Sequence, residues 1–137
     1  MNERSQNLLQ IRPVISNAKI TADMSSDERF QNETVRPIIS LQSLLLLATF
    51  RNYVAKHKNT FLQLSLEKRQ LFIENAIQKD IKFRNSLKGM IIGQFTIEEY
   101  ADYIKNSSAL NKRMMNMVIE RLKDQIQLLE PEEVLFH

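Results

Sequence analysis

Few side chains in this sequence are of the types that catalyse reactions or hold metal ions. The 137 residues include no cysteine and two histidines. His57 has no acidic residue or histidine three or four positions away, the spacing of a helical metal site, and His137 is the last residue. Acidic residues form three pairs: Glu98 and Glu99, Glu120 and Asp124, and Glu132 and Glu133. Acids in a first helical turn or in a tail have ordinary structural uses, so we expect no catalytic residue, metal or cofactor.

The two glycines lie four residues apart in the stretch "GMIIGQFTIEEY", residues 89–100. A phosphate-binding loop of the Walker type needs Lys and then Ser or Thr after its last glycine, but Gln and Phe follow Gly93. A transmembrane GxxxG motif needs about 20 apolar residues, and charged residues confine this stretch. We therefore expect Gly89 or Gly93 to allow close helix approach or to end a helix. An anion held at the helix start near Thr96 remains the alternative.

Positive charge gathers in the middle of the chain, although the net charge is only +3. Residues 51–88 contain nine Lys or Arg and three acids, whereas residues 89–137 contain five and eight. Three phenylalanines lie among these cations, and such a mixture is typical of RNA-binding proteins. Their core-like spacing, without a nucleic-acid-binding motif, favours a solvated basic face instead. The candidate anion-binding residues are Lys79, Lys82, Arg84 and Lys88.

Arg121 is the polar residue that departs most from its surroundings. On a helical wheel it falls inside the apolar arc of the last helix, beside Leu110 and Met114, with Gln125 nearby. A charge in such a place needs a partner. We expect either a salt bridge to an acid on a neighbouring helix, or a polar pocket or subunit interface that includes Arg121 and Gln125.

The composition favours one all-α domain. With 43% hydrophobic residues, the chain can bury a core of ordinary size, and only two Gly and three Pro leave little material for tight turns. No basic segment followed by an apolar one begins the sequence, and the longest apolar run, residues 38–50, is too short for a membrane span. We therefore expect a cytoplasmic protein that does not bind membranes.

The expected architecture is a compact bundle of four to five helices around a central helix near residues 35–57. This helix is apolar on every side, which indicates a central position or an interface, and Pro37 suits its first turn. Residues 1–33 form an N-terminal arm with a short helix capped by Ser25. The helical domain covers residues 34–130, and an acidic and then apolar tail covers residues 131–137.

Local signals mark where the other helices begin. Ser65 is a candidate N-cap, and Asp80 marks a bend or a new helix start. The last helix is expected to be capped near Ser107 or Ser108 and to stop at Pro131.

The firmest prediction is a helix that begins near Ile97. Thr96 with Glu99 three residues later forms a capping box, and Phe95 with Tyr100 fits a hydrophobic staple. Gly89, Gly93, Thr96 and Glu99 are thus expected to be structural residues.

Several blocks of the chain are similar to a family of short bacterial proteins without a known activity, some of which carry an automatic label of glyoxalase. The blocks are "NETVRPIISLQ", "FRNYVAKHKN", "LSLEKR", "NAIQKDIKFRNSLKGMIIGQFTIEEYADYI" and "NSSALNKRMMNMVIERLKDQI", within residues 30–129. The resemblance implies a family and not a chemistry. Glyoxalases use histidine and glutamate metal ligands or a cysteine, and this chain has no cysteine and no histidine cluster.

The sequence therefore predicts an interaction or assembly module without catalysis. Two helices have larger apolar surfaces than one small domain can cover, so we expect a homodimer with Arg121 at or near the contact, and a further protein partner is possible. RNA or anion binding through residues 51–88 and an enzyme of the glyoxalase type are the alternatives.

Overall fold

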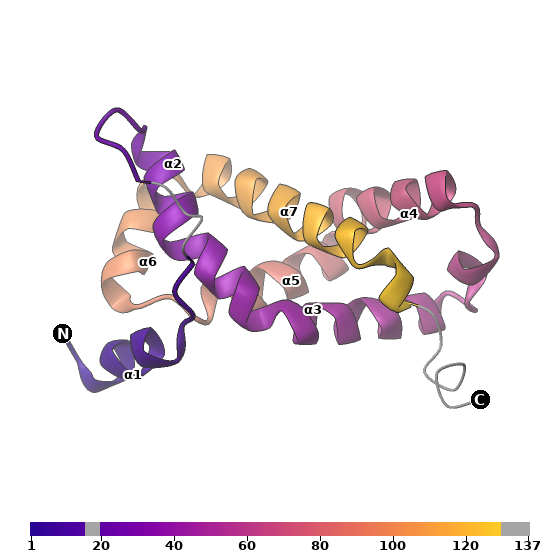
Figure 1. Ribbon diagram of the computed structural model, residues 1–137, viewed down its shortest axis with the longest axis horizontal. Helices are drawn as coiled ribbons and strands as arrows, with labels where there is room; N and C mark the ends of the chain where they lie inside the picture. Colours follow the sequence, from indigo (N-terminus) through magenta and orange to yellow (C-terminus); the bar gives the residue numbers. More distant parts are fainter. Residues whose placement is uncertain (16–19, 130–137) are drawn as a thin grey trace.

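The computed structural model describes residues 1–15 and 20–129 and shows an all-α protein (Figure 1). Of these residues 82% are helical, and no strand occurs among them. α3 and α7 run side by side along the length of the molecule, with α4 at one end and α5 packed against both long helices in the middle. α1, α2 and α6 gather at the other end. The predicted fold class is confirmed.

The N-terminal helix α1, Glu3–Ile11, lies at the edge of the molecule (Figure 1). The side chain of Asn2 caps its start by accepting a hydrogen bond from the backbone N–H of Ser5. The chain leaves the helix in an extended conformation at Arg12, directly before Pro13, because a residue that precedes proline is disfavoured in helical geometry.

The central helix starts earlier than the sequence indicated. Ser25 caps α2, Ser26–Phe30, as predicted, but the chain then continues without a break through a π-helical turn, η1, Gln31–Val35, into α3, Arg36–Lys56. Pro37 therefore lies inside a continuous helix rather than in the first turn of a new one. Proline cannot donate a hydrogen bond to the preceding turn, and the widened turn lies directly before it.

The helical rod ends at a left-handed turn. Lys58 and Asn59 have φ angles of 60° and 58°, the left-handed conformation that ends many helices. Asparagine tolerates this conformation better than most residues do. A short 3₁₀ turn, η2, Thr60–Gln63, follows and buries Phe61 in the core.

Asp80 separates α4, Leu66–Lys79, from α5, Ile81–Ile92. It ends the first helix in an extended conformation and caps the second, because its carboxylate accepts the backbone N–H of Phe83 at 3.2 Å. Ser65 caps α4 in the same way. Both starts were predicted from these residues.

Gly93 ends α5. Ending a helix was one of the two roles expected for the glycines. A Cβ atom at this position would lie 3.0 Å from the carbonyl oxygen of Gly89, so a larger residue would crowd the last turn. Gly89 itself is exposed, and a Cβ there would meet no other atom within 4 Å. Of the two glycines, Gly93 thus has one of the expected uses, and Gly89 has no close helix neighbour.

The helix α6, Ile97–Tyr103, begins where the sequence predicted. Thr96 and Glu99 form the capping box: the Glu99 N–H donates to Oγ1 of Thr96 at 3.0 Å, and the Thr96 N–H donates to Oε1 of Glu99 at 2.9 Å. The rings packed against Phe95 are those of Phe30 and Tyr103, while Tyr100 is exposed. The hydrophobic staple is therefore replaced by core packing.

The last long helix, α7, Ser107–Asp124, follows a 3₁₀ turn, η3, Ile104–Asn106. It begins at Ser107, but the predicted cap by Ser107 or Ser108 is wrong, because Asn106 holds the N-cap position and no side chain among the described residues caps the helix. The helix ends at Asp124, before Pro131, which lies outside the described residues. A 3₁₀ turn, η4, Ile126–Leu129, succeeds it and buries Leu129 against the bundle. The helix thus stops at Asp124, before any proline is reached, and the next residue, Gln125, is bonded to Ser43 of α3.

Candidate functional site

The N-terminal arm is bound to the turn between α5 and α6. Arg4 donates to the carbonyl oxygens of Phe95 and Gly93 at 2.8 and 2.9 Å, and Arg12 donates to that of Gln94 at 2.8 Å. Three successive carbonyl groups after a helix end have no intrahelical partner, and the arm supplies two guanidinium groups to them. The stretch that contains the two glycines is therefore an internal docking site for residues 1–12.

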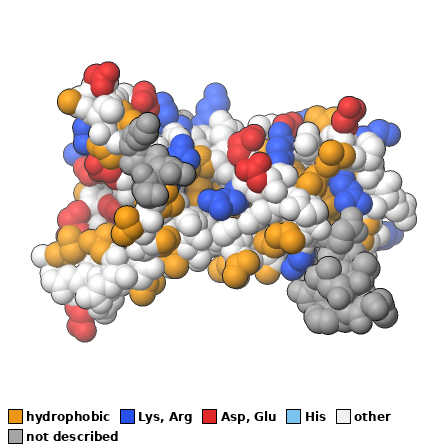
Figure 2. Space-filling model, in the orientation of Figure 1, with side chains coloured by type: hydrophobic (Ala, Val, Ile, Leu, Met, Phe, Trp, Pro, Cys, Tyr) orange, Lys and Arg blue, Asp and Glu red, His pale blue; other side chains and the backbone are white. Residues whose placement is uncertain are grey.

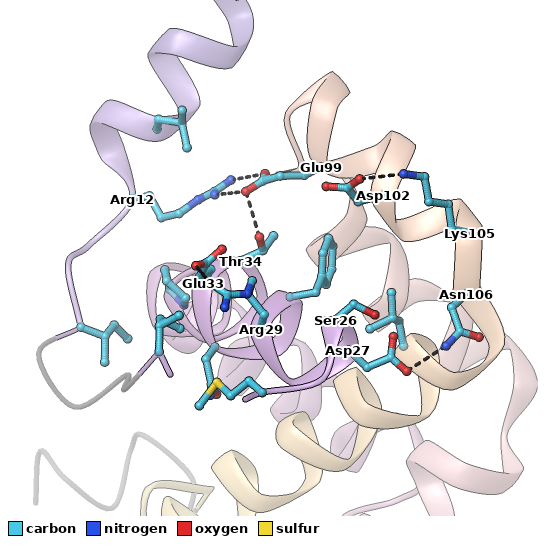
Figure 3. A pocket seen from close by; sticks show the side chains of 18 of the residues that line it. Arg12, Ser26, Asp27, Arg29, Glu33, Thr34, Glu99, Asp102, Lys105 and Asn106 are labelled. Atoms are coloured by element: carbon cyan, nitrogen blue, oxygen red, sulfur yellow. Dashed lines mark hydrogen bonds and ion pairs between the residues drawn. The ribbon is translucent and has the colours of Figure 1, made fainter. Parts of the chain in front are cut away.

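An ion pair between Arg12 and Glu99 lies beneath this turn (Figure 3). The guanidinium of Arg12 donates to both carboxylate oxygens at 2.6 and 3.0 Å, and the hydroxyl of Thr34 donates to Oε2 at 3.1 Å. The side chains of Arg12 and Glu99 are only 7% and 18% exposed. Together with the capping bond from Thr96, these contacts occupy the carboxylate on every side.

Glu99 is held in its ionised form. Burial by itself would raise the pKa of this carboxyl, but the hydrogen bonds from Arg12 and the Thr96 backbone, the charge of Arg12 and the hydrogen bond from Thr34 together lower it. A carboxylate with a lowered pKa and no free acceptor position has nothing to offer a substrate. Glu99 is therefore a structural residue, in agreement with its capping role.

A cavity of about 920 Å³ opens beside this ion pair (Figure 3). Its other charged side chains have partners at the rim, one a neutral amide and the others charges within the same helical segment. Asn106 donates to Asp27 at 2.8 Å, and the ion pairs Arg29–Glu33 and Asp102–Lys105 each close at 3.3 to 3.4 Å. Because the polar groups are already satisfied, this cavity has few groups left for recognising a polar ligand.

A second hollow, of about 1050 Å³, lies between α7 and the start of α3. Three arginines line it, Arg36, Arg113 and Arg121, and we call it the arginine-lined groove. Arg36 donates to Oδ1 of Asn32, and Arg113 donates to Oε1 of Gln31, both at 2.9 Å. These partners are neutral amides, so they fix the two guanidinium groups without neutralising their charge.

The predicted salt bridge of Arg121 is not found. No hydrogen bond or ion pair joins Arg121 to another residue within 1–15 and 20–129. It is half-buried in the last turn of α7, where the helix dipole favours a cation. The alternative expectation, a polar pocket that includes Arg121 and Gln125, agrees with the structure, because both residues line the groove.

Gln125 forms part of the wall of this groove. Its side-chain N–H donates to Oγ of Ser43 at 3.1 Å, which ties the end of α7 to α3. Its Oε1 is enclosed and finds no donor in the part of the chain that the structure describes. Gln125 therefore holds the two helices at a fixed spacing.

A third cluster, which the sequence analysis missed, joins α3 to the Asp80 bend. The hydroxyl of Tyr53 donates to Asp80 at 3.0 Å, and its ring stacks on those of His57 and Phe83, with centroids 4.1 and 4.2 Å away. Nδ1 of His57 lies 2.8 Å from the carbonyl oxygen of Tyr53, so this nitrogen carries the proton. The break in hydrophobic periodicity at Asp80 was the one signal that could have pointed here.

The titration of this cluster argues against a catalytic role. Burial, the hydrogen bond to Asp80 and the negative charge of Asp80 raise the pKa of Tyr53 to about 12. The backbone N–H of Phe83 and the hydroxyl of Tyr53 lower the pKa of Asp80. Both groups are therefore fixed in their ordinary forms at neutral pH, whereas an acid–base catalyst needs a pKa near the working pH.

The structure places only part of the predicted anion-binding set together. Lys79 and Lys82 line a shallow hollow of about 580 Å³ beside His57. Arg84 instead donates to the carbonyl oxygen of Ile77 at 3.4 Å, and Lys88 lies half-buried further along α5.

The aromatic residues of the basic segment are not displayed on the surface. Phe61 and Phe83 are buried, and Phe72 is packed against the core beside them. Arg51 and Arg69 also donate to backbone carbonyl oxygens within the molecule. Rings in the core cannot stack on bases, so RNA binding through residues 51–88 lacks support from stacking and stays a prediction.

The outer side of α3 carries an uncharged stripe, which we define as Leu41, Leu44, Leu45, Ala48, Asn52 and Ala55. At about 100° per residue these side chains fall on one side of the helix. Leu44 is 79% exposed and Leu45 is 52% exposed. Figure 2 shows hydrophobic side chains gathered at this edge of the molecule, over the middle of α3. Ile39, which lines the arginine-lined groove, and Ser43, which is bonded to Gln125, lie on the opposite side of the helix.

The helix that bears this stripe also has the length and composition of a membrane span. Ser26–Lys56 comprises 31 residues and reaches a mean hydropathy of 1.3 over 18 of them. The sequence analysis judged the longest apolar run, residues 38–50, too short for a membrane span. The continuous helix extends beyond this run on both sides, and as a whole it is long enough. Its polar residues are bonded within the bundle, however: Gln42 donates to the carbonyl oxygen of Met90 at 2.9 Å, and Ser43 accepts from Gln125. Core helices of soluble proteins share these properties.

The fold and these contacts define a small all-α protein whose buried charges are structural. In the part of the chain that the structure describes, no three His, Asp or Glu residues are grouped as a metal site. The sequence matches no family model, no curated protein and no solved structure. The resemblance to short bacterial proteins therefore stays a prediction.

Proposed function

We propose that this protein is a non-catalytic assembly module that forms a homodimer through the uncharged stripe of α3. The observation that carries the proposal is the exposure of Leu44 and Leu45, side by side in the middle of a 21-residue helix. Each leucine that becomes fully buried contributes about 1.5–3 kcal/mol. Contact with another apolar surface removes these side chains from water and therefore gives the largest favourable free energy.

The order of residues along the stripe fits a second copy of the same chain. The large leucines occupy its N-terminal half, and the small or polar residues Ala48, Asn52 and Ala55 occupy its C-terminal half. In an antiparallel pair with its two-fold axis at Ala48, Leu41 faces Ala55 of the partner and Leu44 faces Asn52. Large side chains then meet small ones, and Ala48 allows the helices to approach closely.

The charges around the stripe allow such a contact. No charged residue occurs between Arg36 and Arg51. Arg51 lies at the margin of the stripe, opposite Leu45 of the partner, and its guanidinium donates to the carbonyl oxygen of Leu128 within its own chain. Arg121 faces the groove on the other side of α3. The proposed contact therefore does not include Arg121, in contrast to what the sequence alone indicated.

The absence of catalysis in this proposal is supported by the state of the buried groups. Glu99 is fully hydrogen-bonded, and Tyr53 and Asp80 are bonded to each other. A cytoplasmic location belongs to the proposal as well, because a chain without cysteine is compatible with a reducing compartment.

Sedimentation equilibrium at micromolar protein tests the proposal. We expect the wild type to have the mass of a dimer and Leu44→Glu to have that of a monomer, because the new charge would be buried in the contact, opposite Asn52 of the partner. Leu71→Glu is the matched control, since Leu71 is also an exposed leucine, 56% accessible, on α4. A wild-type monomer at all concentrations, or equal dissociation by both variants, would contradict the proposal.

Membrane binding is the competing use of the same stripe. Flotation with phosphatidylcholine vesicles, with and without phosphatidylglycerol, separates the two. We expect the wild type to stay with the soluble fraction. If it floats as a monomer and Leu44→Glu does not, the stripe binds lipid and the dimer is excluded.

A further inference from the structure

We propose that the arginine-lined groove binds a small organic oxyanion, a phosphate monoester or a carboxylate that carries an apolar body. The site lies on the opposite side of α3 from the uncharged stripe, and the inference does not depend on dimerisation. Its basis is the charge, the geometry and an apolar patch of the groove.

The three guanidinium groups approach one space from two helices. Arg36 stands at the start of α3, while Arg113 and Arg121 are eight residues apart on α7, or about 12 Å along the helix axis. All three line the same hollow of about 1050 Å³. Arginine side chains are long enough to converge on one anion from positions at this spacing, and their planar donors match phosphate and carboxylate oxygens.

The positive charge of the groove is not neutralised by ion pairs. Arg36 and Arg113 are held by neutral amide oxygens, and Arg121 has no partner among the described residues. Such an arrangement keeps two guanidinium groups positioned and leaves their remaining N–H donors available. Cations placed close together repel one another, and a bound anion relieves this repulsion.

Two acids also line the groove, and both are exposed. Glu120 lies 3.9 Å from the ammonium of Lys123, which itself pairs with Glu74. Asp124 ends α7 at the rim. Three arginines against two rim acids leave a net positive charge, so the groove selects an anion and the acids disfavour one with high charge density.

Among the mostly polar lining residues, Ile39 and Met117 supply an apolar patch beside the arginines. Ile39 is buried, and Met117 is packed against the core between Arg113 and Arg121 in the sequence. Methionine adapts its shape to different ligands. A hollow of this volume can enclose a small organic molecule, with its charged group at the arginines and its apolar part on this patch. The ligand therefore needs both an oxyanion and an apolar part.

The test is a titration of ¹⁵N-labelled protein, followed by amide and arginine Nε chemical shifts. The probes are hexyl phosphate, hexanoate, inorganic phosphate and hexan-1-ol. We expect hexyl phosphate or hexanoate to shift Met117, Arg113 and Arg121 with saturation at millimolar concentration or below. Inorganic phosphate should bind more weakly because it has no apolar part, and hexan-1-ol should not shift the arginines. The first two probes also distinguish a phosphate from a carboxylate site.

Matched variants locate the site. Arg121→Gln should weaken the preferred probe roughly tenfold, the usual effect of losing one charge-assisted hydrogen bond. Lys112→Gln removes the same charge from the exposed side of α7 and should change affinity less than about twofold. Arg36→Gln tests the arginine on α3 and should also weaken binding of the preferred probe.

Four results would overturn the inference: no saturable shifts with either organic anion, equal binding of hexan-1-ol, equal weakening by Lys112→Gln, or shifts confined to Leu44 and Leu45. Binding of a hexaglutamate peptide without binding of hexyl phosphate or hexanoate would also overturn it, in favour of an acidic protein partner.

Discussion

Arg12 donates two hydrogen bonds to the carboxylate of Glu99, at 2.6 and 3.0 Å, across 87 positions of sequence. This pair joins the end of α1 to the first turn of α6, where Glu99 also completes the capping box. One carboxylate thus stabilises a helix start and holds the N-terminal arm on the bundle.

Removal of one partner of this pair should destabilise the protein. For Arg12→Ala we expect a loss of about 2–3 kcal/mol in the free energy of unfolding, because Glu99 keeps its charge in a largely buried position. Urea denaturation measures this loss. Arg29→Ala is the control: it breaks an exposed ion pair with Glu33 and should cost less than about 1 kcal/mol. If the two variants lose equal free energy of unfolding, the buried ion pair stabilises the protein no more than an exposed one does.

The stability of the folded state should depend on pH through Glu99. Its pKa in the folded protein lies below the ordinary 4.5, so its contribution is fully present above that value and is lost as the pH falls through the lower, folded-state pKa. The difference in unfolding free energy between the wild type and Glu99→Gln should therefore shrink on acidification below about pH 5. Urea titrations at several pH values measure it, and a difference that grows on acidification would refute the assignment.

Thr96→Ala should cost on the order of 1 kcal/mol of stability, because it removes the hydroxyl that accepts the Glu99 N–H. Ser108→Ala serves as the control, since Ser108 is exposed in the first turn of α7 and does not cap it. Thermal or urea unfolding of both variants gives the comparison. An unchanged midpoint for Thr96→Ala would mean that the cap does not stabilise α6.

Tyr53 should titrate with a pKa of about 12, well above the ordinary 10. In Asp80→Asn this pKa should fall toward 10, because the negative charge next to the phenol is removed while asparagine still caps α5. The ¹³Cζ chemical shift of selectively labelled tyrosine follows the titration. Asp102→Asn, remote from Tyr53 in sequence and on α6, should leave it unchanged. A Tyr53 pKa that is the same in Asp80→Asn would show that burial alone raises it.

The predicted helix starts were correct where a single residue and its near neighbours decide them. Ser25, Ser65, Asp80 and Thr96 all cap helices, because a cap depends on groups only two or three residues apart. The end of α7 was misplaced for the opposite reason. It ends where the helix meets the bundle, and no proline or glycine marks that point.

The sequence by itself determined the all-α class, most of the helix starts and the unusual position of Arg121, since these follow from local spacing and helical periodicity. Only the tertiary structure decided which charges are paired. Arg12 and Glu99 are too far apart in sequence for any pattern to join them, and their contact exists because α1 folds back onto the turn after Gly93. Arg121 was expected to find an acid, but no acidic side chain of a neighbouring helix lines the groove that it faces. Pairing of charges depends on long-range packing. A hydrophobic pattern shows which face of a helix is buried, but it does not show which residue of another helix that face will meet.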